Sequence, residues 1–100
     1  MVKHIILWKL KEDFSVEEKN TIKANIKREL EGLYGEIAGL KEIKVQIESL
    51  ETSNADLMLD SLFEDEASLK GYAVHEKHVA VANEFVRPFT EVRMCLDFEV

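Results

Sequence analysis

The sequence predicts an α+β fold in which four strands and two helical regions follow one another in the order β-α-β-β-α-β. Three observations lead to this prediction. Apolar residues alternate with a period of two in several stretches, which is typical of strands. They recur at helical spacing elsewhere, which is typical of helices that cover a core. Short turn-forming segments separate these stretches, and a length of 100 residues suits one domain over residues 1–100.

The first predicted strand covers Val2–Lys11. Side chains on a strand point alternately to its two faces. His4 and Trp8 share one face with further apolar residues, whereas Ile5 and Leu7 lie on the opposite face. The middle of this strand is therefore apolar on both sides, which is typical of a sheet that is covered on both sides.

The first helix is predicted from about Val16 to about Tyr34. Ser15 and Glu18 match a capping box, in which the serine hydroxyl accepts a hydrogen bond from the third helical N–H and the glutamate reaches back to the cap. An apolar stripe follows at helical spacing, so one side of the helix faces the core. The stripe consists of Ile22, Ile26, Leu30, Leu33 and Ile37.

Two further strands are predicted at Leu40–Leu50 and Ala55–Phe63, with turn-forming residues at 51–54 between them. A connection this short predicts a β-hairpin. Along the first of these strands, Val45 and its apolar neighbours face away from Gln46 and its charged neighbours. This strand is therefore expected to be polar on one side.

A second helical region begins after Asp65, whose side chain suits an N-cap. We expect this region to break near His75, to resume, and to end before Pro88, because a proline disfavours helix in the residue that precedes it. The last strand is predicted over Glu91–Val100, with alternating apolar and polar residues along its whole length.

This order of elements is the split β-α-β, or ferredoxin-like, arrangement, with both helical regions on one face of a four-stranded antiparallel sheet. The other face needs a partner, because the first strand is apolar on both sides. Packing two such sheets in a C2 dimer closes a dimeric α/β barrel, so we expect a homodimer. On that face we expect an apolar centre surrounded by Lys44, Gln46, Glu48, Arg93, Asp97 and Glu99.

The chain carries a formal net charge of −7. Nucleic-acid binding and adhesion to anionic membranes need concentrated lysine and arginine, so neither partner is expected. No stretch approaches the roughly 20 apolar residues of a membrane span, and the first residues lack the features of a signal peptide. The expected location is the cytoplasm. Cys95 is the only cysteine, which excludes an intrachain disulfide.

Three histidines, His4, His75 and His78, are the first candidates for chemistry. Three imidazole nitrogens are a ligand set that zinc accepts. The spacing matches no specific metal signature, however, and no carboxylate at a fixed offset completes one. We therefore expect no metal and no other cofactor. A further alternative is that the histidines only satisfy hydrogen bonds at a helix bend.

Acid–base chemistry is the remaining alternative. Histidine both accepts and donates a proton near neutral pH, and tyrosine donates a hydrogen bond to a developing oxyanion. A pocket of this kind would bind a small hydrophobic or aromatic carbonyl compound and promote an aldol-type condensation or a proton shift. The predicted catalytic residues are His78, Tyr72 and His4, and the predicted substrate-binding residues are Trp8, His75 and Phe85.

Three segments of the chain resemble the stress-responsive α/β barrel family, whose members are also called dimeric A/B barrel (Dabb) domains. Together they span most of the chain. They are Met1–Lys11, with His4 in the strand; Leu62–His78, with its Tyr-x-x-His-x-x-His element; and Val92–Glu99, which ends in Asp97-Phe98-Glu99.

The resemblance implies a ferredoxin-like homodimer whose two sheets form a barrel. Most members have no established activity, some plant members are stress-induced, and one plant branch cyclises a linear polyketide by aldol condensation. The positions that match this branch are His4, Tyr72 and His78, with His78 as the base. Some members also contain a bound divalent ion such as magnesium.

Three functions are open at this point. The first is a homodimer of undefined cellular role with a small hydrophobic ligand pocket. The second is a polyketide-cyclase-like enzyme in which His78 is the base and Tyr72 and His4 polarise a carbonyl group. The third is a structural, stress-protective dimer without a pocket. The enzyme hypothesis predicts that His78 points into a cavity of roughly 300 Å³ or more.

Overall fold

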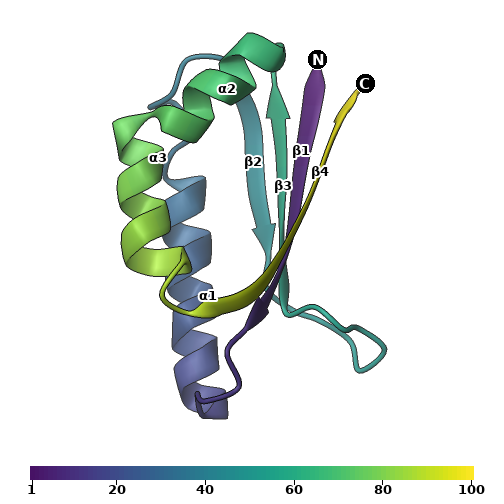
Figure 1. Ribbon diagram of the computed structural model, residues 1–100, viewed down its shortest axis with the longest axis vertical. Coiled ribbons are helices and arrows are strands. Elements are labelled where there is room, and N and C mark those ends of the chain that lie inside the picture. Colours follow the sequence, from purple (N-terminus) through teal and green to yellow (C-terminus); the bar gives the residue numbers. More distant parts are fainter.

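A computed structural model describes residues 1–100, and Figure 1 shows a sheet with all of its helices on one side. The elements follow the predicted order, with the second helical region divided. They are β1 (Val2–Leu10), α1 (Val16–Glu31), β2 (Leu40–Gln46), β3 (Leu57–Phe63), α2 (Glu66–Val74), α3 (Glu76–Val81), a π-helical turn η1 (Ala82–Val86), and β4 (Thr90–Glu99).

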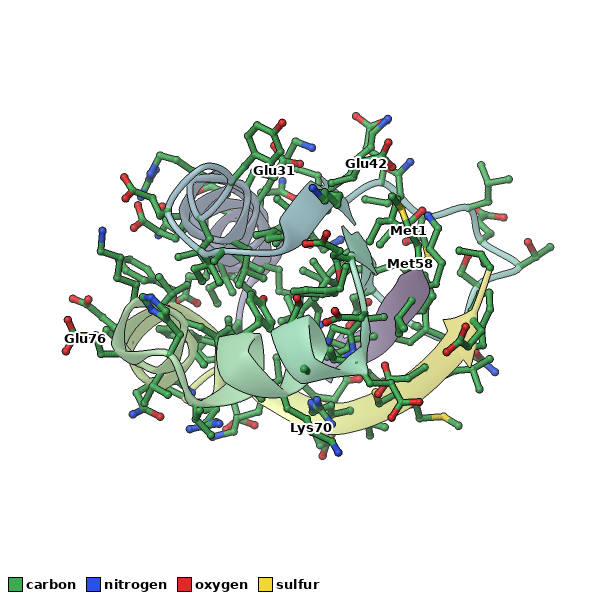
Figure 2. All side chains as sticks on the ribbon, turned by 90° about the horizontal axis from the view of Figure 1, so that it is seen from above. Met1, Glu31, Glu42, Met58, Lys70 and Glu76 are labelled. Atoms are coloured by element: carbon green, nitrogen blue, oxygen red, sulfur yellow. The ribbon has the colours of Figure 1, made fainter.

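The sheet has the antiparallel strand order β2-β3-β1-β4, which confirms the ferredoxin-like arrangement. β1 is central, with His4 opposite Ser61 on β3 and opposite Asp97 on β4. The helices cover the face that carries His4, whose ring lies beside that of Tyr72 on α2. β4 is an edge strand and curves around below α2 in Figure 2. The core between helices and sheet includes the buried residues Ile6, Leu10, Ile26, Leu30, Leu59 and Phe63.

The predicted cap of α1 is present. The backbone N–H of Glu18 donates to the Ser15 hydroxyl, and the Glu18 carboxylate accepts from the Ser15 N–H. The helix ends at Glu31, three residues before the predicted end at Tyr34, yet Leu33 and Ile37 beyond it stay buried. The apolar stripe therefore extends past the helix into the turn. None of the helices is long and apolar enough to cross a membrane.

The length predicted for the connection between β2 and β3 is wrong. β2 ends at Gln46 and β3 begins at Leu57, so residues 47–56 form a long connection instead of a four-residue turn. Asp56 supplies the physical reason. Its N–H donates to the Trp8 carbonyl, and its carboxylate accepts from the Leu10 N–H, so it binds the end of β1 instead of continuing toward β2.

The predicted break in the second helical region occurs at His75. This residue has an extended backbone, with ψ at 132°, and its Nδ1 accepts a hydrogen bond from the Lys77 N–H at the start of α3. After α3 the chain widens into η1, where the Arg87 N–H bonds to the Ala82 carbonyl five residues back. The sequence did not predict this turn. The helical region ends before Pro88, as expected.

The expected distribution of polar residues on the sheet is wrong for β4. Because Asp97 lies opposite His4, the set that contains Arg93 and Asp97 points to the helix side. The other side of the sheet carries the apolar set instead, and Met58, labelled in Figure 2, belongs to it. Lys44 and Gln46 do lie on that side, as predicted. Its apolar members are Ile5, Leu7, Met58, Leu62, Val92, Met94, Leu96 and Phe98.

Gly39 allows α2 to pack close to the start of β2. Its φ is +82°, and a Cβ atom there would lie 2.2 Å from the Ser68 hydroxyl oxygen. We expect Gly39→Ala to lower the free energy of unfolding by roughly 1–3 kcal/mol, because it adds backbone strain and a steric clash. Urea denaturation measures this change.

Gly71→Ala is the matched control, because Gly71 lies within α2 with open space around its Cβ position. We expect this substitution to leave the protein equally stable, or more stable by up to about 1 kcal/mol, since alanine favours helix over glycine. Equal stability of the two variants would contradict the packing role of Gly39.

Candidate functional site

A small cavity lies between the helix side of the sheet and the second helical region. Its volume is about 120 Å³, and four of the predicted residues, His4, Trp8, Tyr72 and His78, line it. Aliphatic side chains from β1, β3, α1, α2 and η1 form most of the remaining wall. The structure therefore brings four of the six predicted residues to one cavity, and the enclosed space is smaller than the expected roughly 300 Å³.

An open groove of about 610 Å³ adjoins this cavity. It lies between α2 and β4, and His4, Leu69, Ala73 and Arg93 line both spaces. Figure 2 shows Lys70, another residue of this groove, on the side of α2 toward β4. Because the two spaces share these four residues, a ligand larger than the cavity would extend into the groove.

Tyr72 is the most unusual residue of the site. It is only 1% exposed, and its hydroxyl is buried without a hydrogen-bond partner. Burial raises the pKa of the Tyr72 phenol well above its ordinary value, so the hydroxyl keeps its proton. A buried donor without an acceptor costs roughly 1–3 kcal/mol, and buried polar groups in native proteins are normally paired. This hydroxyl is therefore available to a carbonyl oxygen that enters the cavity.

His78 lies directly against Tyr72, with ring centroids 4.1 Å apart. Its Nδ1 is 3.3 Å from the Ala73 carbonyl oxygen, to which it donates, so Nε2 carries the free lone pair in the neutral ring. Burial lowers the pKa of His78, and the charges of Arg87, His4 and Arg93 lower it further. A neutral imidazole at neutral pH is a proton acceptor, which is what a general base needs.

His4 is held by a residue that the sequence did not single out. Its Nδ1 lies 2.5 Å from a carboxylate oxygen of Asp97, and its ring centroid is 6.2 Å from that of Tyr72. The carboxylate accepts from Nδ1–H, so it fixes the orientation of the ring and leaves Nε2 for the site. The alternation along the last strand led us to expect Asp97 on the open face of the sheet, whereas the register to β1 brings it to His4 on the helix side.

Cys95 completes a group of three potential metal ligands with His4 and Asp97. Magnesium prefers oxygen ligands, and only Asp97 supplies oxygen here, so this set does not fit the ion suggested by the family resemblance. Burial, followed by the neighbouring Asp97, raises the pKa of the Cys95 thiol, which disfavours the thiolate that zinc binds. The three histidines do not form a common ligand group.

Two of the predicted substrate-binding residues lie elsewhere. His75 caps α3 through its Nδ1, which is a structural role at the helix break. Phe85 is partly buried and packs against the main core. Neither is among the residues that line the cavity, whereas Trp8 is. The helical spacing placed His75 near the site, but the break at that residue turns its ring toward the backbone of α3.

The family model of the stress-responsive A/B barrel domain matches residues 2–100 of this chain. The chain belongs to the Dabb family. No curated protein sequence matches it.

Among solved structures, a dimeric protein of unknown function with a ferredoxin-like fold from Bacteroides fragilis is 33% identical to this Dabb domain. The match covers 99% of this chain and 95% of the other, with a TM-score of 0.92. A Dabb family protein from Mesorhizobium loti is 19% identical, with coverages of 99% and 95% and a TM-score of 0.75.

A hydroxynitrile lyase from Passiflora edulis is also similar in structure. It is 20% identical, the match covers 97% of this chain and 90% of the lyase, and the TM-score is 0.72. At this level of sequence identity, the similarity shows only that the two proteins share a fold.

The lowered pKa of His78 links its protonation to stability. The unfolded chain takes up a proton on this histidine near its ordinary pKa of about 6.5, while the folded protein resists it. The free energy of unfolding should therefore decrease as the pH falls through and below that value.

We expect this decrease to be smaller in His78→Gln, because glutamine has no imidazole that could take up a proton. Urea denaturation of both proteins between about pH 7 and about pH 5 measures the difference. Parallel curves for the two proteins would contradict the lowered pKa. An NMR titration of the His78 ring reports the midpoint directly.

Proposed function

We propose that this Dabb domain binds a small carbonyl compound in its cavity and moves a proton at the carbon next to the carbonyl group. The observation that carries this proposal is the buried Tyr72 hydroxyl, which has no hydrogen-bond partner of its own. Its neighbour His78, whose ring lies against that of Tyr72, lines the same cavity and can act as the base. A donor for an oxygen and a base for a proton are the two groups that enolisation requires.

In the proposed reaction Tyr72 donates a hydrogen bond to the carbonyl oxygen of the ligand. Nε2 of neutral His78 then removes a proton from the adjacent carbon, and the negative charge that moves to the oxygen is stabilised by the Tyr72 hydroxyl. His4, oriented by Asp97, supplies a further polar atom, Nε2, at the same cavity. His78 then returns the proton to a different atom of the ligand, which completes a proton shift.

The same intermediate also supports an aldol-type, polyketide-cyclase-like reaction. If the ligand contains a second carbonyl group, the enolate carbon attacks it, and His78 returns its proton to the new alkoxide. The resemblance of the fold to a hydroxynitrile lyase supports the view that this scaffold accommodates an enzyme active site. Binding of a small hydrophobic ligand without turnover is the simpler form of the proposal.

We further propose that two copies of the chain pack through the sheet face that the helices leave open. Its centre consists of apolar side chains on β1 and β4 that are exposed in one copy, including Leu7, Met94 and Leu96. Large exposed apolar patches mark association sites. The 33% identical protein from Bacteroides fragilis is described as dimeric, which supports the same assembly here. The cytoplasm stays the expected location.

The dimer proposal predicts that Leu96→Glu yields monomers. Leu96 is 64% exposed in the single chain, and a buried unpaired charge at a dimer interface is strongly unfavourable. Light scattering at micromolar concentration measures the mass. Val16→Glu is the control, because it adds the same charge to an exposed apolar position at the start of α1, away from the sheet. A wild-type protein with the mass of one chain would refute the dimer.

The catalytic proposal predicts that the protein accelerates deuterium exchange next to the carbonyl group of 2-pentanone, followed by proton NMR in deuterated water. We expect Tyr72→Phe and His78→Gln to lower this rate by roughly 100-fold, since each removes one partner of the proton transfer. Tyr34→Phe is the matched control, because Tyr34 is an exposed tyrosine outside the cavity. Absence of exchange in the wild type would contradict the catalytic role.

A stress-protective dimer without a ligand is the alternative outcome. Trp8 is the only tryptophan of the chain and lines the cavity, so its fluorescence reports on occupancy independently of turnover. A change in Trp8 fluorescence on addition of 2-pentanone, if it is smaller in Tyr72→Phe, supports the ligand site. No change at saturating ketone, together with no exchange, would favour the purely structural alternative.

A further inference from the structure

The formal charges that line the cavity all have one sign. The chain as a whole is acidic, with 20 aspartate and glutamate residues against 13 lysine and arginine residues. The cavity wall nevertheless contains Arg87 and Arg93 and no aspartate or glutamate at all. An acidic protein thus presents a locally positive surface at the one place where it also presents a tyrosine donor and a histidine base.

Neither arginine is neutralised by an acidic partner. The ion pairs of the protein involve other cationic groups, and neither Arg87 nor Arg93 takes part in one. Arg87 donates to the neutral amide oxygen of Asn83 through Nη1, which leaves its other guanidinium N–H groups free to bind a ligand. Two unpaired guanidinium groups beside one cavity are an arrangement suited to a carboxylate.

Two features of the fold place these arginines at the same cavity. The π-helical turn η1, closed by the hydrogen bond from the Arg87 N–H to the Ala82 carbonyl, determines where Arg87 leaves the helix. On β4, pairing of Arg93 with Trp8 puts Arg93 on the helix side of the sheet. Arg93 also lines the groove, so it lies where the groove meets the cavity.

We propose that Arg87 and Arg93 form an anion subsite and that the natural ligand is a carbonyl compound with a carboxylate group. This inference rests on the proposed function and further specifies that the ligand carries a negative charge. The carboxylate binds the arginines at the entrance, and the carbonyl group reaches Tyr72 and His78 further inside. The sensitivity of the His78 pKa to both arginines is consistent with their charges acting within the site.

The acidic residues nearby do not cancel this effect. Glu66, Asp97 and Glu99 line the groove but not the cavity. The carboxylate of Asp97 is engaged by Nδ1 of His4. Lys70 adds a positive charge on the opposite wall of the same groove. The cavity wall beside Arg87 and Arg93 thus carries no carboxylate, and the three acidic side chains lie along the adjoining groove.

The test compares 4-oxopentanoate with its methyl ester, which has the same ketone and no negative charge. Binding is measured from the fluorescence of Trp8, and deuterium exchange next to the ketone is measured in parallel. We expect the acid to bind about tenfold more tightly than the ester, the effect of one charge-assisted hydrogen bond in a partly solvated site. This preference should decrease as salt is added, because salt screens the arginine charges.

We expect Arg93→Gln and Arg87→Gln each to reduce the preference for the acid, and the double variant to abolish it. Arg28→Gln is the matched control. It removes the same charge from α1, where Arg28 pairs with Glu29 outside the cavity, and it should retain the full preference.

The outcomes separate the two proposals. Tighter binding of the acid that depends on both arginines supports the anion subsite even if no exchange occurs, in which case the catalytic proposal alone fails. Equal binding of acid and ester, or a preference that survives in the double variant, overturns the anion subsite even if 2-pentanone exchanges normally. If Arg28→Gln also lost the preference for the acid, the preference would depend on the overall charge of the protein. This result would overturn the anion subsite as well.

Discussion

β1 and β4 pair so that His4 lies opposite Asp97 and Trp8 lies opposite Arg93. Most other features depend on this register. It brings a carboxylate to the ring of His4 and a guanidinium group to the entrance of the cavity. It also turns the apolar side chains of β4 to the open face of the sheet, where they form the proposed dimer surface. A shift by one residue would exchange these two sets, because successive side chains on a strand point to opposite faces.

The site combines groups that are individually unfavourable for stability. The Tyr72 hydroxyl is buried without a partner, and His78 is packed in a way that disfavours its charged form. Natural sequences contain such local conflicts mainly where function requires them. The capped start of α1 and the buried core from β1, β3 and α1 compensate for this loss of stability elsewhere in the fold. A rigid framework of this kind is also what keeps the tyrosine and histidine rings in contact.

The divided helical region determines how the second half of the site is assembled. A continuous helix from Glu66 to Val86 would distribute its side chains at a single uniform spacing. The break at His75 changes the direction of the chain, and η1 changes the helical spacing once more before Arg87. Tyr72 before the break, His78 after it and Arg87 at the end therefore all line one cavity. The capping role of His75 is part of this construction, which explains why this histidine does not line the cavity.

The sequence by itself determined the order of the elements, the cap at Ser15, the break at His75 and the apolar character of β1 on both faces. These are local properties, because they follow from side-chain periodicity and from contacts within a few residues. It also singled out His4, Trp8, Tyr72 and His78 by residue type, and these four residues line one cavity. Only the tertiary structure decided that Asp97 and Arg93 join them, that Asp56 lengthens the connection before β3, and that Phe85 lies outside the site. Those outcomes depend on strand register and helix direction, which bring together residues far apart in the chain and leave no periodic signal in it.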